Sequence, residues 1–223
     1  MKTTTLGLAL AAVLSAHTAI AQQSSDGNWM LRVRALHLEP ANQSSAGNGN
    51  SGITSTVLPS DAVNVSSKWI PEFDVSYFFT PNIAAELVLT VPQKHDVTIT
   101  KGPLAGTHAG TLKELPPTLL LQYHFAPDAQ FRPYVGAGVN YTRISNVDLG
   151  SLNSITGTGS NLDRNSWGGA LQAGFDIKVT KNSYINFDVK KLYIQSDLQV
   201  GGNTVSTLKI NPLLWGVGYG FRF

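Results

Sequence analysis

Charged residues recur at every second position in several parts of this chain, and they are the first candidates for chemistry. The ionisable residues at even-numbered positions of these parts are Arg32, Arg34, Glu72, Asp74, Glu86, His124, Asp176, Lys178, Asp188, Lys190 and Arg222. Without the histidine, this set holds five cations and five carboxylates. Burying charged groups is costly unless they are paired. Equal numbers of opposite charges therefore predict a plug of interlocked ion pairs, with His124 beside it.

The histidines and serines form no recognisable catalytic or metal-binding motif. The histidines beyond residue 21 are His37, His95, His108 and His124, and no two of them are four residues apart. The chain therefore lacks the His-Glu-x-x-His pattern of zinc enzymes, and it also lacks the Gly-x-Ser-x-Gly motif of hydrolases. Cysteine is absent, which excludes disulfides and thiolate metal sites. We expect no enzyme activity, no metal site and no cofactor.

The elements that must position the even-numbered charges are β-strands. Eight segments alternate between apolar and other residues, and the apolar residue is odd-numbered in all of them. These segments are residues 29–35, 73–77, 83–91, 119–125, 135–141, 171–177, 185–189 and 213–223. Successive side chains of a strand point to opposite faces. The odd-numbered side chains are thus predicted to meet one environment and the even-numbered ones another.

The composition indicates that the odd-numbered face meets lipid. No run of eighteen apolar residues follows residue 21, which argues against a membrane-spanning helix, yet 42% of residues are hydrophobic and only 13% are charged. The even-numbered face carries glycines, which suit a narrow interior. Aromatic residues near strand ends are expected to form two interfacial girdles, namely Trp29, Trp69, Trp167, Tyr77, Tyr123, Tyr141, Tyr184 and Phe223. We predict an all-β fold, an eight-stranded antiparallel up-and-down transmembrane β-barrel. A soluble barrel or sandwich with its apolar face inward is the alternative.

Both ends of the chain indicate export. Residues 1–21 combine a basic start, an apolar stretch and a small-x-small cleavage site, so we predict a cleaved signal peptide followed by one barrel domain at residues 22–223. The predicted location is the bacterial outer membrane. The last strand ends in Phe223, which is expected to be the signal that the barrel-assembly machinery recognises. With 16 basic and 14 acidic side chains, the chain has no footprint for nucleic acid.

The connections between the predicted strands alternate between short and long. The short ones contain Pro, Asn or Asp and are residues 80–82, 126–130 and 180–183. The long ones are rich in Gly, Ser, Asn and Thr and are residues 39–67, 101–114, 145–165 and 199–206. Bacterial barrels place short turns in the periplasm and long loops outside. The ion-pair plug is therefore predicted at the periplasmic end.

Towards the long connections, the even-numbered residues become apolar. They are Leu36, Leu38, Ile70, Val88, Leu120, Ala170, Leu192 and Leu214. An eight-stranded lumen is wide enough only for side chains or one slim ligand. We therefore predict a hydrophobic pocket open to the outside and closed below, although these residues could also simply fill the barrel. Lys191 on the lipid face suggests a bulge or a shifted strand boundary, and a bulge would turn Leu192 outward.

Prolines lie near the outer ends of the predicted strands. They are Pro71, Pro92, Pro116, Pro117 and Pro212. Each proline removes one hydrogen-bond donor from the strand ladder, so the wall could open sideways at Pro71, Pro92, Pro117 and Pro212. The alternative is that these prolines only end the strands.

Several motifs, in order, resemble the OmpW/AlkL family of small outer-membrane proteins. They are GNWMLRVR at residues 27–34, WIPEFD at 69–74, TPNIAAE at 80–86, LPPTL at 115–119, RPYVGAGVNY at 132–141, NP at 211–212 and GYGFRF at 218–223. The resemblance implies an eight-stranded barrel with a hydrophobic channel that is closed towards the periplasm. It also implies uptake of small hydrophobic compounds and their sideways release into the membrane. Some members of the family are bacteriocin receptors, a role that belongs to the loops.

Two functions are therefore open. The first is passive uptake of small hydrophobic molecules, with outer-membrane lipid and these molecules as partners. The second is a structural or interaction barrel whose outer loops bind a bacteriocin, a phage or a surface ligand, while the lumen is only packed.

Overall fold

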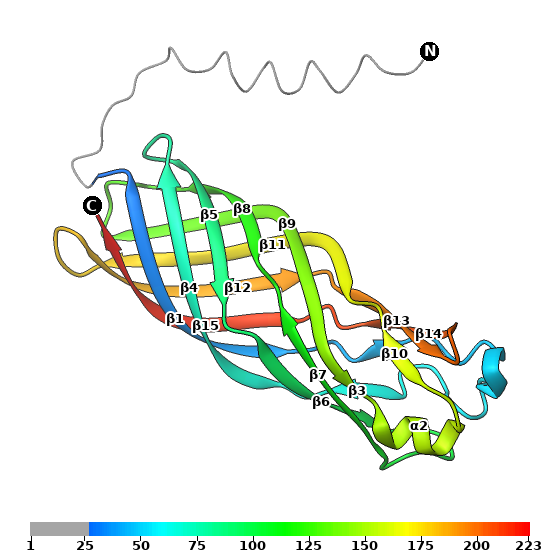
Figure 1. The fold of residues 1–223 in the computed structure, drawn as a ribbon. Helices are drawn as coiled ribbons and strands as arrows, with labels where there is room; N and C mark the ends of the chain where they lie inside the picture. Colours follow the sequence, from blue (N-terminus) through cyan, green and yellow to red (C-terminus); the bar gives the residue numbers. More distant parts are fainter. Residues whose placement is uncertain (1–26) are drawn as a thin grey trace, which may run out of the picture.

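The computed structural model describes residues 27–223, so the predicted signal peptide at residues 1–21 lies outside the described part. Eight long strands wind into a closed antiparallel barrel, as Figure 1 shows. They are β1 (Trp29–Glu39), β4 (Lys68–Phe78), β5 (Ile83–Thr90), β8 (Thr118–His124), β9 (Phe131–Asp148), β11 (Asn165–Lys178), β12 (Ser183–Leu192) and β15 (Leu213–Arg222). Each strand pairs with the next, and β15 pairs with β1 to close the barrel. The predicted fold class is confirmed.

The two faces of the barrel wall separate by residue parity as predicted. Outward side chains such as Leu121 and Val139 are 60% and 54% exposed, whereas the inward Arg32 is 1% exposed. The predicted bulge near Lys191 is wrong, because β12 stays in register with both neighbouring strands. Leu192 therefore points inward, and the Lys191 ammonium donates a hydrogen bond to the Asn211 carbonyl. Among residues 27–223, no helix is long and apolar enough to span a bilayer.

Aromatic side chains mark both edges of the apolar outer band. At the periplasmic edge, the rings of Trp29 and Tyr77 lie 4.9 Å apart between centroids, and at the outer edge those of Trp69 and Trp215 lie 5.3 Å apart. Tyr184 does not belong to a girdle. It is 1% exposed and lies inside the barrel, where its even number should have placed it.

The two ends of the described chain meet at the periplasmic edge. The backbone amides of Trp29 and Phe223 each donate a hydrogen bond to the other residue's carbonyl, at 3.0 and 2.8 Å. The Phe223 side chain is half exposed. Recognition of Phe223 by the assembly machinery stays a prediction.

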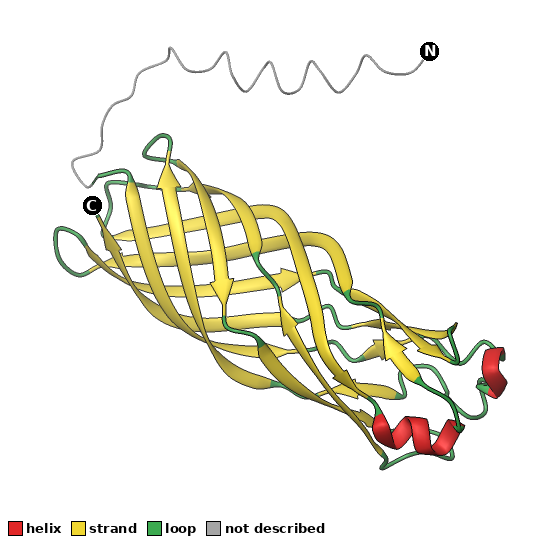
Figure 2. Ribbon diagram, viewed as in Figure 1, coloured by secondary structure: helices red, strands yellow, loops and turns green. Residues whose placement is uncertain are grey.

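The expectation of four polar loops is wrong in part, because much of these segments, and of the residues that flank them, is regular structure. Their elements are β2 (Gln43–Ser44), η2 (Asn50–Gly52), β3 (Val63–Val65), β6 (Gln93–Ile99), β7 (His108–Leu115), α2 (Gly150–Thr156), β10 (Ser160–Leu162), β13 (Gln195–Val200) and β14 (Asn203–Lys209). Together with the outer end of β9, the strands among them extend the barrel, and the helices lie at its far end, as Figure 2 shows. We call this part the outer extension. Most of its buried residues are apolar, which the overall polar composition of the segments concealed.

Three inward positions of β15 are glycines, namely Gly216, Gly218 and Gly220, and they leave room in the lumen for its charged side chains. A Cβ atom at Gly218 would lie 2.4 Å from the Val33 carbonyl oxygen and 2.6 Å from the Arg34 Cγ. We expect Gly218→Leu to destabilise the barrel by about 1 to 3 kcal/mol or more through overpacking. The measurement is the fraction of heat-modifiable barrel on a gel. Val217→Leu on the exposed outer face is the control, and an equal effect of both changes would contradict the explanation.

Candidate functional site

The periplasmic half of the lumen is filled by paired charges. Arg32 donates hydrogen bonds to the carboxylates of Glu86 and Asp176, both at 2.7 Å. Both ion pairs are buried, with at most 3% of any of these side chains exposed. The two acids come from β5 and β11, so Arg32 on β1 bridges the lumen.

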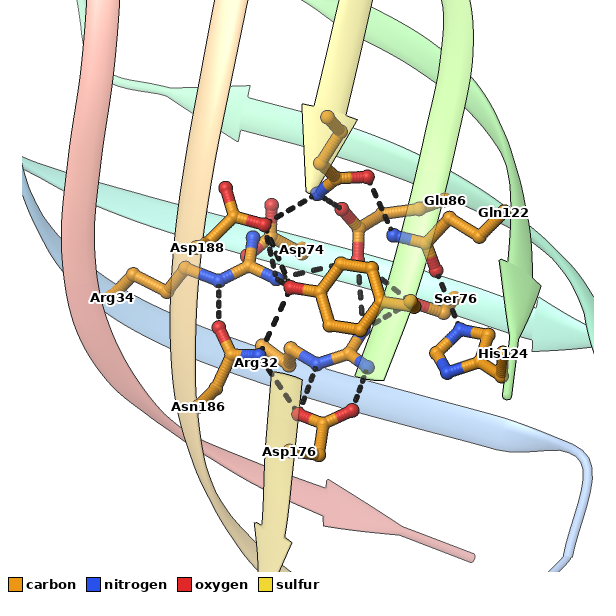
Figure 3. Close-up of polar contacts among 12 residues, drawn as sticks. Arg32, Arg34, Asp74, Ser76, Glu86, Gln122, His124, Asp176, Asn186 and Asp188 are labelled. Carbon is orange, nitrogen blue, oxygen red and sulfur yellow. Dashed lines mark hydrogen bonds and ion pairs between the residues drawn. The ribbon is translucent and has the colours of Figure 1, made fainter. Parts of the chain in front are cut away.

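A second arginine, two residues further along β1 and further from the periplasm, is also paired with carboxylates. Arg34 donates to Glu72 at 2.9 Å and to Asp74 at 2.6 Å, and Lys190 bonds to Glu72 at 2.8 Å and to Asp188. Figure 3 shows the two guanidinium groups surrounded by carboxylates from several strands. Eight of the predicted residues thus form one ion-pair plug, namely Arg32, Arg34, Glu72, Asp74, Glu86, Asp176, Asp188 and Lys190.

The other three predicted members lie at the edge of the plug. The His124 ring bonds to Gln122 at 3.1 Å and is not part of an ion pair in the plug. Arg222 donates to the Gly27 carbonyl at 2.9 Å and lies over the Phe78 ring at the periplasmic mouth. Lys178 is only partly buried, at the end of β11.

Uncharged polar residues complete the plug, and the charge count did not include them. They are Ser76, Gln122, Tyr134, Gln172 and Asn186. The Gln172 amide, for example, donates to Glu86 at 2.9 Å and to Asp188 at 2.7 Å. All five are even-numbered, so the parity rule would have found them. Nearly every buried polar atom here has a partner, with Glu72 Oε2 and Asp74 Oδ1 as the exceptions in the plug.

The seven predicted lumen residues are all buried above the plug. Leu36, Leu38, Ile70, Val88, Leu120, Leu192 and Leu214 are each at most 3% exposed. They belong to one apolar cluster that continues into the outer extension. The structure therefore brings them together, and their contact with a ligand stays a prediction.

An apolar cavity lies further out than the sequence predicted. Its lining is entirely hydrophobic and comes from the outer extension, with Ile53, Val97, Ile99, Leu149 and Leu198 among the residues. None of the seven predicted lumen residues lines it. The volume is about 20 Å³, room for about one water molecule. A hydrocarbon can occupy this cavity only if the lining side chains move apart.

The barrel wall has a gap in strand register at three of the prolines. The β5 ladder with β8 stops at the pair Val88 and Thr118, and pairing resumes in β6 and β7 at Gln93 and Glu114. Residues 89–92 thus oppose the shorter segment 115–117, with no paired positions between them in the described chain. Pro92 and Pro117 lie in these two segments. We call this region the wall gap.

Pro71 borders the wall gap, and Pro212 does not. The pairing of β4 with β5 ends at Glu72 and Thr90, so Pro71 lies just beyond the last pair. The Pro212 carbonyl instead accepts a hydrogen bond from the Leu192 amide at 3.1 Å, which keeps this part of the wall connected. Pro212 therefore lies outside the wall gap, and its role in a gate stays a prediction.

A comparison with known proteins identifies the family. The model described as the OmpW family matches residues 25–223. The chain belongs to the OmpW family. The OmpW-family barrel described here is accordingly an outer-membrane protein, and its apolar outer band lies in the lipid of that membrane.

Relatives and solved structures agree with this assignment. Outer membrane protein W of Vibrio cholerae is 32% identical over 235 residues, which cover 100% of both chains. The uncharacterized outer-membrane protein y4mB of Sinorhizobium fredii is 38% identical over 200 residues, 87% of this chain and 80% of that one. The crystal structure of OprG from Pseudomonas aeruginosa has a TM-score of 0.74 at 28% identity, and covers 88% of this chain and 96% of that chain.

One side of the lumen in this OmpW-family barrel is polar above the plug, contrary to the expected apolar lining. The buried polar residues on this side are Gln93, His95, Glu114, Thr118, Asn140 and Thr142. Sequence parity missed Gln93 and His95, because the extra residue at the wall gap turns the odd-numbered residues of β6 inward. A slip of one residue exchanges the faces of a strand. Asn140 donates to the carbonyls of Pro116 and Pro117 at 3.2 and 3.3 Å, and these carbonyls also accept hydrogen bonds from the Thr118 hydroxyl and the Tyr141 amide.

Proposed function

We propose that this OmpW-family barrel takes up small hydrophobic molecules passively across the outer membrane. The observation that carries the proposal is the continuity of apolar surface from the outer cavity to the lumen residues above the plug. An apolar solute gains about 25 cal/mol for each Å² that leaves water. The cavity would therefore collect such molecules from outside, and thermal opening of its lining would pass them inward.

The ion-pair plug argues against straight passage into the periplasm. Opening a path through it would separate buried charges, at a cost of several kcal/mol for each broken pair. Sideways release through the wall gap is cheaper, because Pro92, Pro116 and Pro117 have no amide hydrogen to bond across it. We assign Pro71, Pro92 and Pro117 to this lateral gate.

A relative supports the choice of cargo. The protein named dibenzothiophene metabolism operon protein PahQ, from Pseudomonas aeruginosa, is 28% identical over 169 residues, 74% of this chain and 77% of that one. Its name links it to the metabolism of an aromatic, apolar compound. A barrel that brings such compounds to the cell would have the apolar path described above.

The test replaces one lumen leucine with a polar residue of similar size. Leu120 is 1% exposed inside the lumen, and its neighbour Leu121 is 60% exposed on the lipid face. We expect Leu120→Asn to lower the initial rate of n-decane uptake by cells about fivefold, for a loss of about 1 kcal/mol of apolar contact. Leu121→Asn should leave the rate per folded barrel unchanged.

Two results would argue against uptake. One is a decane rate in cells with the barrel that equals the rate in matched cells without it. The other is an equal response to Leu120→Asn and Leu121→Asn. Either result would favour a barrel with a packed lumen that acts through its outer surface.

A further inference from the structure

A carboxylate on the inward face of β7 has no hydrogen-bond donor within the described chain. Glu114 is 1% exposed, and neither of its side-chain oxygens accepts a hydrogen bond from any of residues 27–223. Leaving a buried carboxylate unpartnered costs free energy because its hydration is lost. The site therefore favours a molecule that brings a donor.

The polar group nearest to the Glu114 carboxylate is the His95 ring, which offers a second acceptor beside it. The His95 Nδ1 atom lies 2.7 Å from the Ser66 carbonyl oxygen, and a carbonyl can only accept, so Nδ1 carries the hydrogen. The Nε2 atom lies 3.4 Å from the Glu114 Oε1 atom, within ion-pair distance but without a hydrogen bond between the two atoms. In a neutral ring this Nε2 atom is an acceptor. A hydroxyl or amine hydrogen placed between these two atoms would be attracted to both.

The other polar residues of this wall form hydrogen bonds with groups other than Glu114 and His95. The Gln93 amide donates to the Val91 carbonyl at 2.8 Å, and the Thr142 hydroxyl donates to the Asn140 Oδ1 atom at 2.7 Å. The Asn140 amide in turn donates to the Thr118 hydroxyl at 2.8 Å and to the two proline carbonyls of the wall gap. None of these donors bonds to Glu114 or to His95.

The acceptor pair lies between the outer cavity and the wall gap. Val97 lines the cavity and is two residues from His95 along β6, about 7 Å in an extended strand. On β7, Glu114 immediately precedes Leu115, the first residue of the gap segment 115–117. A molecule that moves from the cavity to the gap therefore passes the acceptor pair.

We propose that Glu114 and His95 recognise a single hydroxyl or amine hydrogen on an otherwise apolar molecule. This assignment rests on the proposed uptake function and names its cargo as monofunctional amphiphiles, such as medium-chain alcohols, rather than plain hydrocarbons. The apolar body of the molecule contacts the cavity and the buried Leu112 and Ile144, while its polar hydrogen bonds to the acceptor pair.

The experiment compares uptake of 1-decanol with uptake of n-decane in cells that carry the barrel, after subtraction of the rates in cells without it. In Glu114→Gln, the new amide can donate to the His95 Nε2 atom, so the site no longer needs an external donor. We expect the decanol-to-decane ratio to fall about fivefold, because decane has no polar hydrogen to bond to the pair. Lys113→Gln is the matched control, because Lys113 is the outward neighbour on β7. An unchanged ratio would overturn the assignment.

A second measurement is independent of transport and of any variant. The ¹⁵N resonances of the His95 ring are followed in the purified, unaltered barrel while 1-decanol or n-decane is added. We expect a shift with 1-decanol only. Failure of decane uptake by the unaltered barrel would refute the uptake proposal, whereas the absence of a selective His95 shift would refute the recognition site itself.

Discussion

Replacing Arg34 with methionine is expected to destabilise the barrel by about 3 to 5 kcal/mol, the usual cost of removing one partner of a buried ion pair. The reason lies in Asp74, whose Oδ2 atom bonds to Arg34 at 2.6 Å and whose Oδ1 atom has no partner among residues 27–223. Loss of the guanidinium therefore leaves a buried carboxylate without a donor. The measurement is equilibrium unfolding by urea in lipid vesicles.

A double variant separates the lost ion pair from lost packing. Adding Asp74→Asn to Arg34→Met removes the uncompensated charge, so we expect part of the stability to return, as in a double-mutant cycle. Lys181→Met in the exposed periplasmic turn is the control for loss of a positive charge. If Arg34→Met and Lys181→Met had the same effect, the plug would not contribute to stability as described.

Covalent closure of the wall gap is expected to reduce uptake of n-decane to the rate of cells without the barrel. Continuing the β5 and β8 ladder beyond Val88 and Thr118 would place Val91 opposite Leu115. The chain has no cysteine, so Val91→Cys with Leu115→Cys introduces one defined disulfide. Oxidation should close the gap and stop uptake, and reduction should restore it.

The control for this cross-link lies in the same hairpin below the gap. Leu87 and Leu119 are directly paired, and both face the lipid. A disulfide between Leu87→Cys and Leu119→Cys should leave uptake unchanged, because this part of the ladder is already closed. Uptake that persists after oxidation of the Val91 and Leu115 pair would place the exit elsewhere.

The parity of the sequence predicts the transmembrane part of the barrel well, for a physical reason. Each strand from β1 to β15 that crosses the lipid must keep one face apolar, so a single alternation runs through it without interruption. Arg32, Arg34 and Asp188 could be placed in the lumen because a charge on the lipid face is costly. Even Lys191 obeys the rule, since its ammonium reaches the Asn211 carbonyl.

The outer extension could not be predicted in this way, because no bilayer constrains its alternation. One additional residue at positions 89–92 turns His95 inward, and Asn146, with a φ of 48°, marks a shift in the pairing of β9 with β7. Each shift exchanges inside and outside for all residues that follow it in the strand. The apolar cavity and the Glu114 site depend on these shifts. Alternation in the sequence therefore did not predict them, and it placed the pocket at leucines deeper in the lumen.

The ion pairs of the plug join residues that are synthesised far apart. Arg32 on the first strand is neutralised by Asp176, 144 positions later in the chain. Before the later strands join, Arg32 has only Glu86 on β5 as an ion-pair partner, because Asp176 lies on β11. The ion pairs of the plug are therefore complete only after the last third of the chain has joined the barrel.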